Sequence, residues 1–136
     1  MKARSAVVSF HLHATEDGEK VRKVIKEMLG VEVKATEMLH GHYGNIIFDS
    51  RTPLEQEEAE ALLDRVLTGL GSADRALLLR ELRGHVDDRG IFFVRLDKQE
   101  LLLGRLVLGG SDPVKISVKL SVKGERAEEL IKGCLT

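Results

Sequence analysis

The sequence predicts an α+β fold in which helices pack on one face of a single mixed or antiparallel sheet. The clearest observation is the alternation of apolar and polar residues over 114–122, since successive side chains of a strand point to opposite faces. Apolar residues at helical spacing over 16–29 and 52–70 are the second observation. Strands and helices do not alternate strictly along the chain, which favours an α+β arrangement.

The first half of the chain is expected to begin with a strand over 4–14. A helix follows between Thr15 and Gly30, because threonine is a favoured N-cap and glycine a favoured C-cap. Two strands over 31–39 and 46–51 come next. The loop between them is rich in glycine and asparagine, which is typical of a tight hairpin.

Two helices are expected in the middle of the chain. Thr52, Pro53 and Glu55 combine an N-cap, a proline at the first helical position and the glutamate of a capping box. A helix is therefore expected over 52–70, and a second one from 72 to 84, where glycine ends it.

The second half of the chain is expected to supply three strands. The first covers 90–97 and leads into a short turn or helical corner over 98–103. A second strand is expected over 105–108 and the longest one over 114–122. A short terminal helix is expected over 125–132.

Composition limits the classes of protein that this chain can represent. With 136 residues, 43% of them hydrophobic and 32% charged, the chain is expected to fold as one domain over 1–136. The net charge of −1 means that nucleic-acid binding would depend on how charge is distributed. Cys134 is the one cysteine, so no disulfide can form within the chain. No apolar run reaches membrane-spanning length, and we expect a cytoplasmic protein without a membrane partner.

Basic side chains recur at the strand positions expected on the uncovered face of the sheet, whereas carboxylates gather on the 52–70 helix. Phosphates attract such cations, and an exposed aromatic ring can stack a base. We therefore expect non-enzymatic RNA binding through Lys34, Phe93, Arg95, Arg105, Lys115, Lys119 and Lys123. The alternative is a plain solvated face, since lysines on the wet side of a strand are ordinary and protect edge strands from aggregation.

Four histidines raise the alternative of a metal site with hydrolytic activity. His11 and His13 share one strand face, and His40 and His42 flank the hairpin loop, so the four would cluster if the loop folded toward the first strand. No carboxylate stands at a regular ligand spacing, and we predict no metal and no cofactor. No Ser-His-Asp pattern, phosphate loop or dinucleotide fingerprint occurs, so no catalytic residue is predicted.

Three segments of the sequence resemble segments of a known protein family and occur in the same order as in that family. They are His-Leu-His-Ala-Thr-Glu-Asp at 11–17, Gly-His-Tyr-Gly-Asn at 41–45, and the stretch beginning Val-Arg-Leu-Asp-Lys-Gln at 94–104. Together they resemble the archaeal family of predicted RNA-binding proteins, also described as predicted exosome subunits, over nearly the whole chain. The resemblance implies a fold like that of the large-subunit ribosomal protein that binds 5S rRNA. It also implies RNA binding linked to RNA processing, and no known catalysis.

The motifs add candidates to the RNA-binding face. Lys98 and Gln99 are long polar side chains at a tight corner, where they would reach either a phosphate or solvent. His42, Tyr43 and Asn45 are loop candidates, with Tyr43 able to stack a base. A second hypothesis is a protein-interaction or homodimerisation module that docks through the sheet or its edge. The expected partners are thus RNA, RNA-processing proteins and a second copy of the chain.

Overall fold

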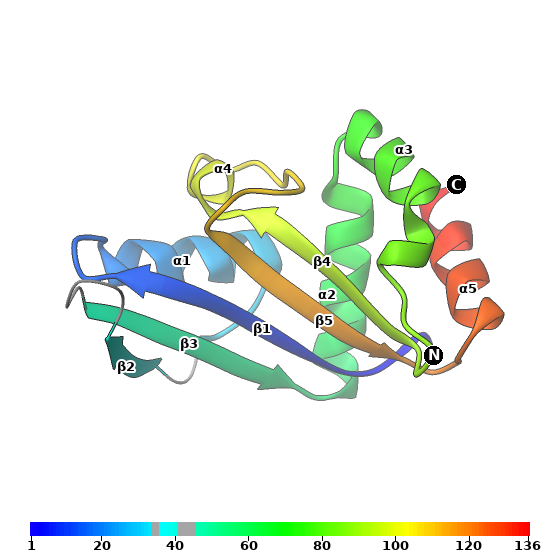
Figure 1. The fold of residues 1–136 in the computed structure, drawn as a ribbon, viewed down its shortest axis with the longest axis horizontal. Coiled ribbons are helices and arrows are strands. Elements are labelled where there is room, and N and C mark those ends of the chain that lie inside the picture. The colour runs from blue at the N-terminus through cyan, green and yellow to red at the C-terminus, as the bar shows by residue number, and fades with distance from the viewer. Residues whose placement is uncertain (34–35, 41–45) are drawn as a thin grey trace.

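The computed structural model describes residues 1–33, 36–40 and 46–136. Within them, five strands form one sheet in the order β2-β3-β1-β5-β4, and every neighbouring pair is antiparallel (Figure 1). The strands are β1 (Ala3–His13), β2 (Thr36–His40), β3 (Ile46–Leu54), β4 (Ile91–Asp97) and β5 (Pro113–Leu120). The first strand of the chain therefore lies at the centre of the sheet.

Helices cover one face of this sheet. They are α1 (Gly18–Leu29), α2 (Gln56–Gly69), α3 (Ser72–Arg80), α4 (Lys98–Leu102) and α5 (Glu125–Leu135). In Figure 1, α1 and α2 lie behind the strands, and α5 packs against α2 and α3 at one end. The predicted α+β fold with helices on one side is confirmed. None of the described helices is both long and apolar enough to cross a bilayer.

The core fills the space between the sheet and the helices. Alternate strand residues such as Val8, Ile116 and Phe92 are buried, and they face buried residues of the helices such as Ile25 and Leu63. This is the two-layer burial that period-2 strands and amphipathic helices produce together. No helix among the described residues covers the opposite face of the sheet, which presents the other half of the side chains of each strand.

The predicted start of the second helix is wrong. β3 continues through Thr52 and Pro53 to Leu54, and α2 begins at Gln56. Thr52 pairs with Val8 of β1 and is only 1% exposed. The gain from extending the central ladder and burying Thr52 exceeds the local preference for a capped helix start.

Other predicted strands also differ from the structure, and the one expected from residue 31 begins at Thr36 as β2. Residues 105–108 form no regular strand but one isolated bridge between Leu96 and Leu108, supported by the N–H of Asp97 donating to the carbonyl of Val107 at 2.8 Å. β5 ends at Leu120 rather than 122. The predicted corner at 98–103 is confirmed as α4, which Asp97 caps by accepting from the N–H of Glu100.

Candidate nucleic-acid interface on the open sheet face

Three basic residues form a row across the open face of the sheet. Arg51 of β3 pairs with Ser9 of β1, Ser9 pairs with Lys115 of β5, and Lys115 pairs with Arg95 of β4. The side chains of the three basic residues are exposed. With strands about 4.8 Å apart, this basic row of Arg51, Lys115 and Arg95 extends for about 14 Å perpendicular to the strands.

The basic row has no carboxylate partner among the residues that the structure describes. Ten ion pairs occur there, and none includes Arg51, Lys115 or Arg95. Like charges directly opposite each other on adjacent strands are destabilising. The pairing of Arg95 with Lys115 is therefore unfavourable in the free protein and becomes favourable when an anion lies between the two side chains.

An exposed aromatic ring lies next to the basic row. Phe93 is 39% exposed and pairs with Ser117, which in turn pairs with Val7 of β1. Lys115 precedes Ser117 by two residues and Lys119 follows it by two, on the same face, so each is a diagonal neighbour of the ring. Lys119 is also exposed and has no described ion pair. The ring thus has a cation on either side, a suitable arrangement for one stacked base and its flanking phosphates.

Three further predicted contacts lie outside the strands. Gln99 is exposed in α4, and Lys123 is exposed in the turn after β5. Arg105 follows α4, and its Nε lies 2.7 Å from Glu100 Oε2, so a carboxylate already balances its charge. The structure does not bring these three side chains into the basic row.

The expectation that Lys98 contacts RNA is corrected. Lys98 is 1% exposed, and its Nζ donates to the carbonyl of His11 at 2.6 Å. The same ammonium lies 2.8 Å from Glu16 Oε1 and 2.7 Å from Asp112 Oδ2. Through these contacts the long side chain of Lys98 connects the end of β1, the residues before α1 and the turn before β5. Lys98 is therefore a structural residue that no phosphate can reach.

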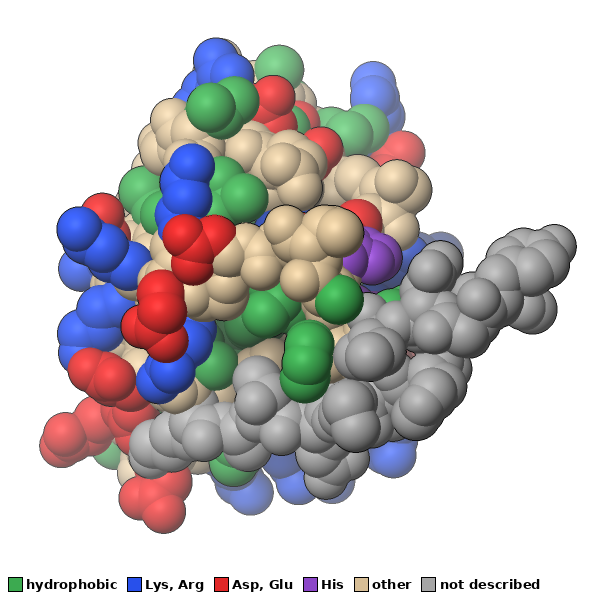
Figure 2. All heavy atoms as spheres, turned by 90° about the vertical axis from the view of Figure 1, so that its left-hand side faces the viewer, with side chains coloured by type: hydrophobic (Ala, Val, Ile, Leu, Met, Phe, Trp, Pro, Cys, Tyr) green, Lys and Arg blue, Asp and Glu red, His purple; other side chains and the backbone are tan. Residues whose placement is uncertain are grey.

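The same cluster bears on the histidine metal site. One ligand atom each of His13, Glu16 and Asp112 lies within 4.8 Å of the others, a geometry open to a cation. The Lys98 ammonium already pairs with both carboxylates, so the position is filled by a side chain. His11 approaches a different acid, with Nδ1 3.5 Å from Asp49 Oδ1. Figure 2 views this end of the molecule and shows histidine beside carboxylate there.

Several sequence candidates fall where no side chain is described. Lys34, His42, Tyr43 and Asn45 lie outside the described residues, and so does the question of whether His40 and His42 approach the first strand. Their roles stay predictions.

Comparison with known proteins adds an independent observation. Residues 5–120 match the model of a protein family described as RNA binding. The chain belongs to this RNA_binding family. It is 25% identical over 140 residues to the RNA-binding protein PAB1135 of Pyrococcus abyssi, a match that covers 97% of this chain and 91% of that protein.

Solved structures of similar proteins share the fold. Mth689, a DUF54 protein from Methanothermobacter thermautotrophicus, superposes with a TM-score of 0.84 at 23% identity, and all of each chain is covered. SSO0741 from Sulfolobus solfataricus, also assigned to DUF54, superposes with a TM-score of 0.80 at 26% identity over 96% of each chain. The α+β arrangement of this RNA_binding family member is thus also found in archaeal relatives.

The predicted separation of charge holds only in part in this RNA_binding family member. Carboxylates do predominate on α2, where Asp64 binds Lys2 and raises the pKa of that lysine. On α1, however, both signs are mixed, as in the ion pair between Arg22 and Glu19. Figure 2 shows basic and acidic side chains interspersed at that end. The helical layer as a whole is therefore not uniformly acidic.

Arg51 is the member of the basic row that sequence reasoning missed. It alternates with Ser50 and Thr52, both of which are buried, so the period-2 signal was present. The strand was expected to stop at Arg51 because the next residues read as a helix start. Extending the alternation through Thr52 would have placed Arg51 on the open face.

Proposed function

We propose that this protein binds RNA without catalysing a reaction, using the basic row of Arg51, Lys115 and Arg95 together with Phe93 and Lys119. The observation that carries the proposal is the direct pairing of Arg95 with Lys115 without a described carboxylate partner. Membership of a family described as RNA binding supports it. The PAB1135 protein of Pyrococcus abyssi, which is called RNA-binding, supports it as well.

The geometry favours single-stranded or looped RNA. Phosphate groups would bind along the basic row, and one base would stack on Phe93, which only an unpaired base can do. An RNA strand that follows the basic row would cross the sheet perpendicular to the protein strands. Specificity on this face would be low, because phosphate contacts and stacking carry little sequence information.

Fluorescence anisotropy with a labelled single-stranded RNA at several salt concentrations tests the proposal. The logarithm of the binding constant should fall with the logarithm of salt concentration, with a slope of about −0.7 for each phosphate contact. Changing both Arg95→Glu and Lys115→Glu should abolish binding. Phe93→Ala should weaken it about 5- to 150-fold, the equivalent of one stacked base, without changing the salt slope.

A matched control has the same change of charge on the helical side. Lys20→Glu with Lys23→Glu alters two exposed lysines of α1 and should leave the affinity within about threefold of the parent, since salt largely screens exposed charges that lie far from the bound RNA. Equal binding by the Arg95→Glu, Lys115→Glu protein and the parent would refute the sheet-face model. Equal loss in both double variants would show that only net charge matters.

A homodimer that docks through this face is less favourable. In a two-fold interface the same patch meets itself, so the basic row of one copy would face basic residues of the other. Such a dimer would bury like charges that have no described acidic partner.

Other parts of the proposal concern the fold relationship, the domain organisation, the cellular location and the protein partners. The family resemblance supports two further proposals, a ribosomal-protein-like fold relationship and an association with exosome or other RNA-processing proteins. A single domain and a cytoplasmic location are proposals that rest on the length and composition of the chain. Affinity purification of the tagged protein from cells, before and after ribonuclease treatment, would test the association. Processing proteins that stay bound after RNA is digested would support direct contact, and their release would show contact through RNA alone.

A further inference from the structure

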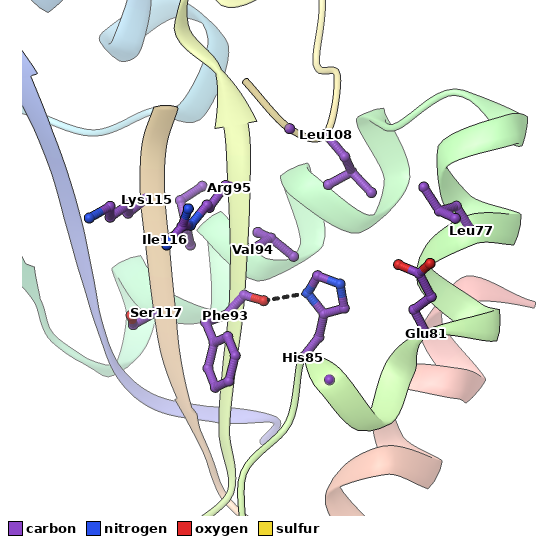
Figure 3. Close-up of a pocket in the computed structure, with 12 residues that line it drawn as sticks. Leu77, Glu81, His85, Phe93, Val94, Arg95, Leu108, Lys115, Ile116 and Ser117 are labelled. Atoms are coloured by element: carbon purple, nitrogen blue, oxygen red, sulfur yellow. Dashed lines mark hydrogen bonds between the residues drawn. The ribbon is translucent and has the colours of Figure 1, made fainter. Parts of the chain in front are cut away.

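A pocket of about 510 Å³ lies on the outer side of β4, between that strand and α3 (Figure 3). Its volume is within the ~300–1,000 Å³ typical of small-ligand sites. Val94, Leu77 and Leu108 form an apolar floor, whereas Glu81 and His85 place polar groups at the side of α3. The pocket is next to the open face, because Phe93, Arg95 and Lys115 contribute to its rim.

The strand edge leaves one hydrogen-bond donor available at this pocket. Phe93 donates its N–H to the carbonyl of His85 at 2.9 Å, and the carbonyl of Arg95 accepts from Gly109 at 2.9 Å. The N–H of Arg95 points to the same side of β4, since the N–H and C=O of one residue share an edge in an antiparallel strand. No acceptor for this N–H is present among the described residues.

Two acceptors lie across from this donor. His85 Nδ1 is 2.8 Å from the carbonyl oxygen of Phe93. A carbonyl only accepts, so Nδ1 is the donor in this contact, and in the tautomer protonated at Nδ1 the other ring nitrogen, Nε2, is an acceptor. Glu81 is exposed, has no described cationic partner, and extends beside His85 toward the pocket (Figure 3).

We propose that this pocket binds an unstacked guanine base of the RNA held on the sheet, an inference that rests on the proposed function. The Watson–Crick edge of guanine has two adjacent donors, N1–H and the N2 amino group, which match the Glu81 carboxylate. Its O6 acceptor matches the N–H of Arg95. Adenine would present the lone pair of N1 to the carboxylate, and uracil and cytosine would fill less of the apolar floor.

The position of the pocket would also let the protein bind a base and a neighbouring phosphate of the same RNA at once. Lys115 and Arg95 belong both to the basic row and to the pocket rim, so a phosphate on the row is close to the pocket entrance. Sequence-specific RNA recognition commonly reads the Watson–Crick edges of splayed-out bases. The pocket would add base preference to a face that by itself supplies only phosphate contacts and stacking.

NMR titration of the full chain with GMP, AMP, CMP and UMP tests this directly. GMP should shift the amide resonance of Arg95 and the imidazole resonances of His85 at a concentration about tenfold or more below that needed with AMP, since hydrogen bonds to a charged group are lost with adenine. Glu81→Gln should remove that preference, and Glu58→Gln, an exposed change on α2, should keep it. Both glutamates are exposed, so neither variant should perturb folding.

The outcomes separate this inference from the function on which it rests. If no nucleotide shifts Arg95, or all four do so equally, the guanine pocket is refuted even when RNA binds to the basic row in the anisotropy assay. If GMP binds preferentially and Glu81→Gln removes the preference, the pocket is supported. If GMP binds but RNA does not, RNA binding is refuted and the pocket is a site for free guanine nucleotides.

Discussion

Arg95 and Lys115 face each other directly across the β4–β5 ladder, and neither has an acidic partner among the described residues. A change that reverses one charge should therefore have opposite effects on stability and on binding. We expect Arg95→Glu to raise the free energy of unfolding by about 0.2–1 kcal/mol, because a repulsive cross-strand pair becomes attractive. The same variant should bind RNA more weakly.

Urea unfolding and fluorescence anisotropy on one preparation measure both quantities. Arg126→Glu, an exposed change on α5, is the matched control and should leave RNA binding unaltered. A variant Arg95→Glu that is less stable than the parent and binds RNA equally well would contradict the role given to this pair.

Lys98 should matter for stability rather than for RNA. Lys98→Met removes the ammonium and leaves the carboxylates of Glu16 and Asp112 close together without a counter-charge. Breaking a buried ion pair from one side costs about 3–5 kcal/mol, and we expect a loss of that order in urea unfolding. Adding Asp112→Asn should recover part of it, because one unpaired charge disappears. Lys23→Met on exposed α1 is the control and should change stability little. A small effect of Lys98→Met would refute the structural role.

Gly90 provides a test of backbone geometry. Its φ is +81°, and a Cβ there would lie 2.3 Å from the carbonyl oxygen of Val122. We expect Gly90→Ala to destabilise the protein by more than about 1–2 kcal/mol, since both the left-handed conformation and the contact are unfavourable. Gly133→Ala, in helix α5 with no atom within 4 Å, should instead stabilise by up to about 1 kcal/mol. Thermal unfolding of both variants measures this contrast, and similar melting temperatures would contradict it.

Asp87 links stability to pH. The N–H of Ile91 donates to its carboxylate at 3.0 Å, and the N–H of Arg89 does so at 2.9 Å, which together lower the pKa of Asp87. The stabilisation is complete above the unfolded-state pKa of about 3.9 and is lost as pH falls through the lower folded-state value. The difference in unfolding free energy between the parent and Asp87→Asn should therefore shrink as pH is lowered from 7 to below 4. A difference that does not change with pH would exclude this linkage.

Sequence reasoning identified those parts of the structure that local pattern determines. The alternation around Lys115 and Lys119 located β5 and its exposed cations correctly, because a period-2 pattern depends only on neighbouring residues. It failed where distant residues decide. Lys98 looked like a surface cation because its partner Glu16 lies 82 positions away in the sequence. Arg51 was missed because a helix signal next to it was overridden by pairing with β1.

The pocket beside β4 could not be predicted from the sequence pattern, for a related reason. Nothing in the local sequence links His85 to Phe93, yet the ring Nδ1 of His85 and its backbone carbonyl both hydrogen-bond to the backbone of Phe93. Glu81 and Arg95 approach the same space from a helix and a strand that only the folded chain brings together. In the sequence, Glu81 is a lone acidic residue near the end of a predicted helix, and that position alone does not indicate a binding site.

The central place of β1 has a consequence for how the chain folds in the cell. Ala6 pairs with Leu54 on one side and with Val118 on the other, so β1 is synthesised long before β5, one of its two partners. Pairings between distant segments form slowly, and a nascent chain cannot make them before both partners have emerged. Until then one edge of β1 remains without its neighbour. We therefore expect the sheet to be completed only after translation has passed β5, and ribosome-bound fragments that end before Pro113 to be sensitive to protease.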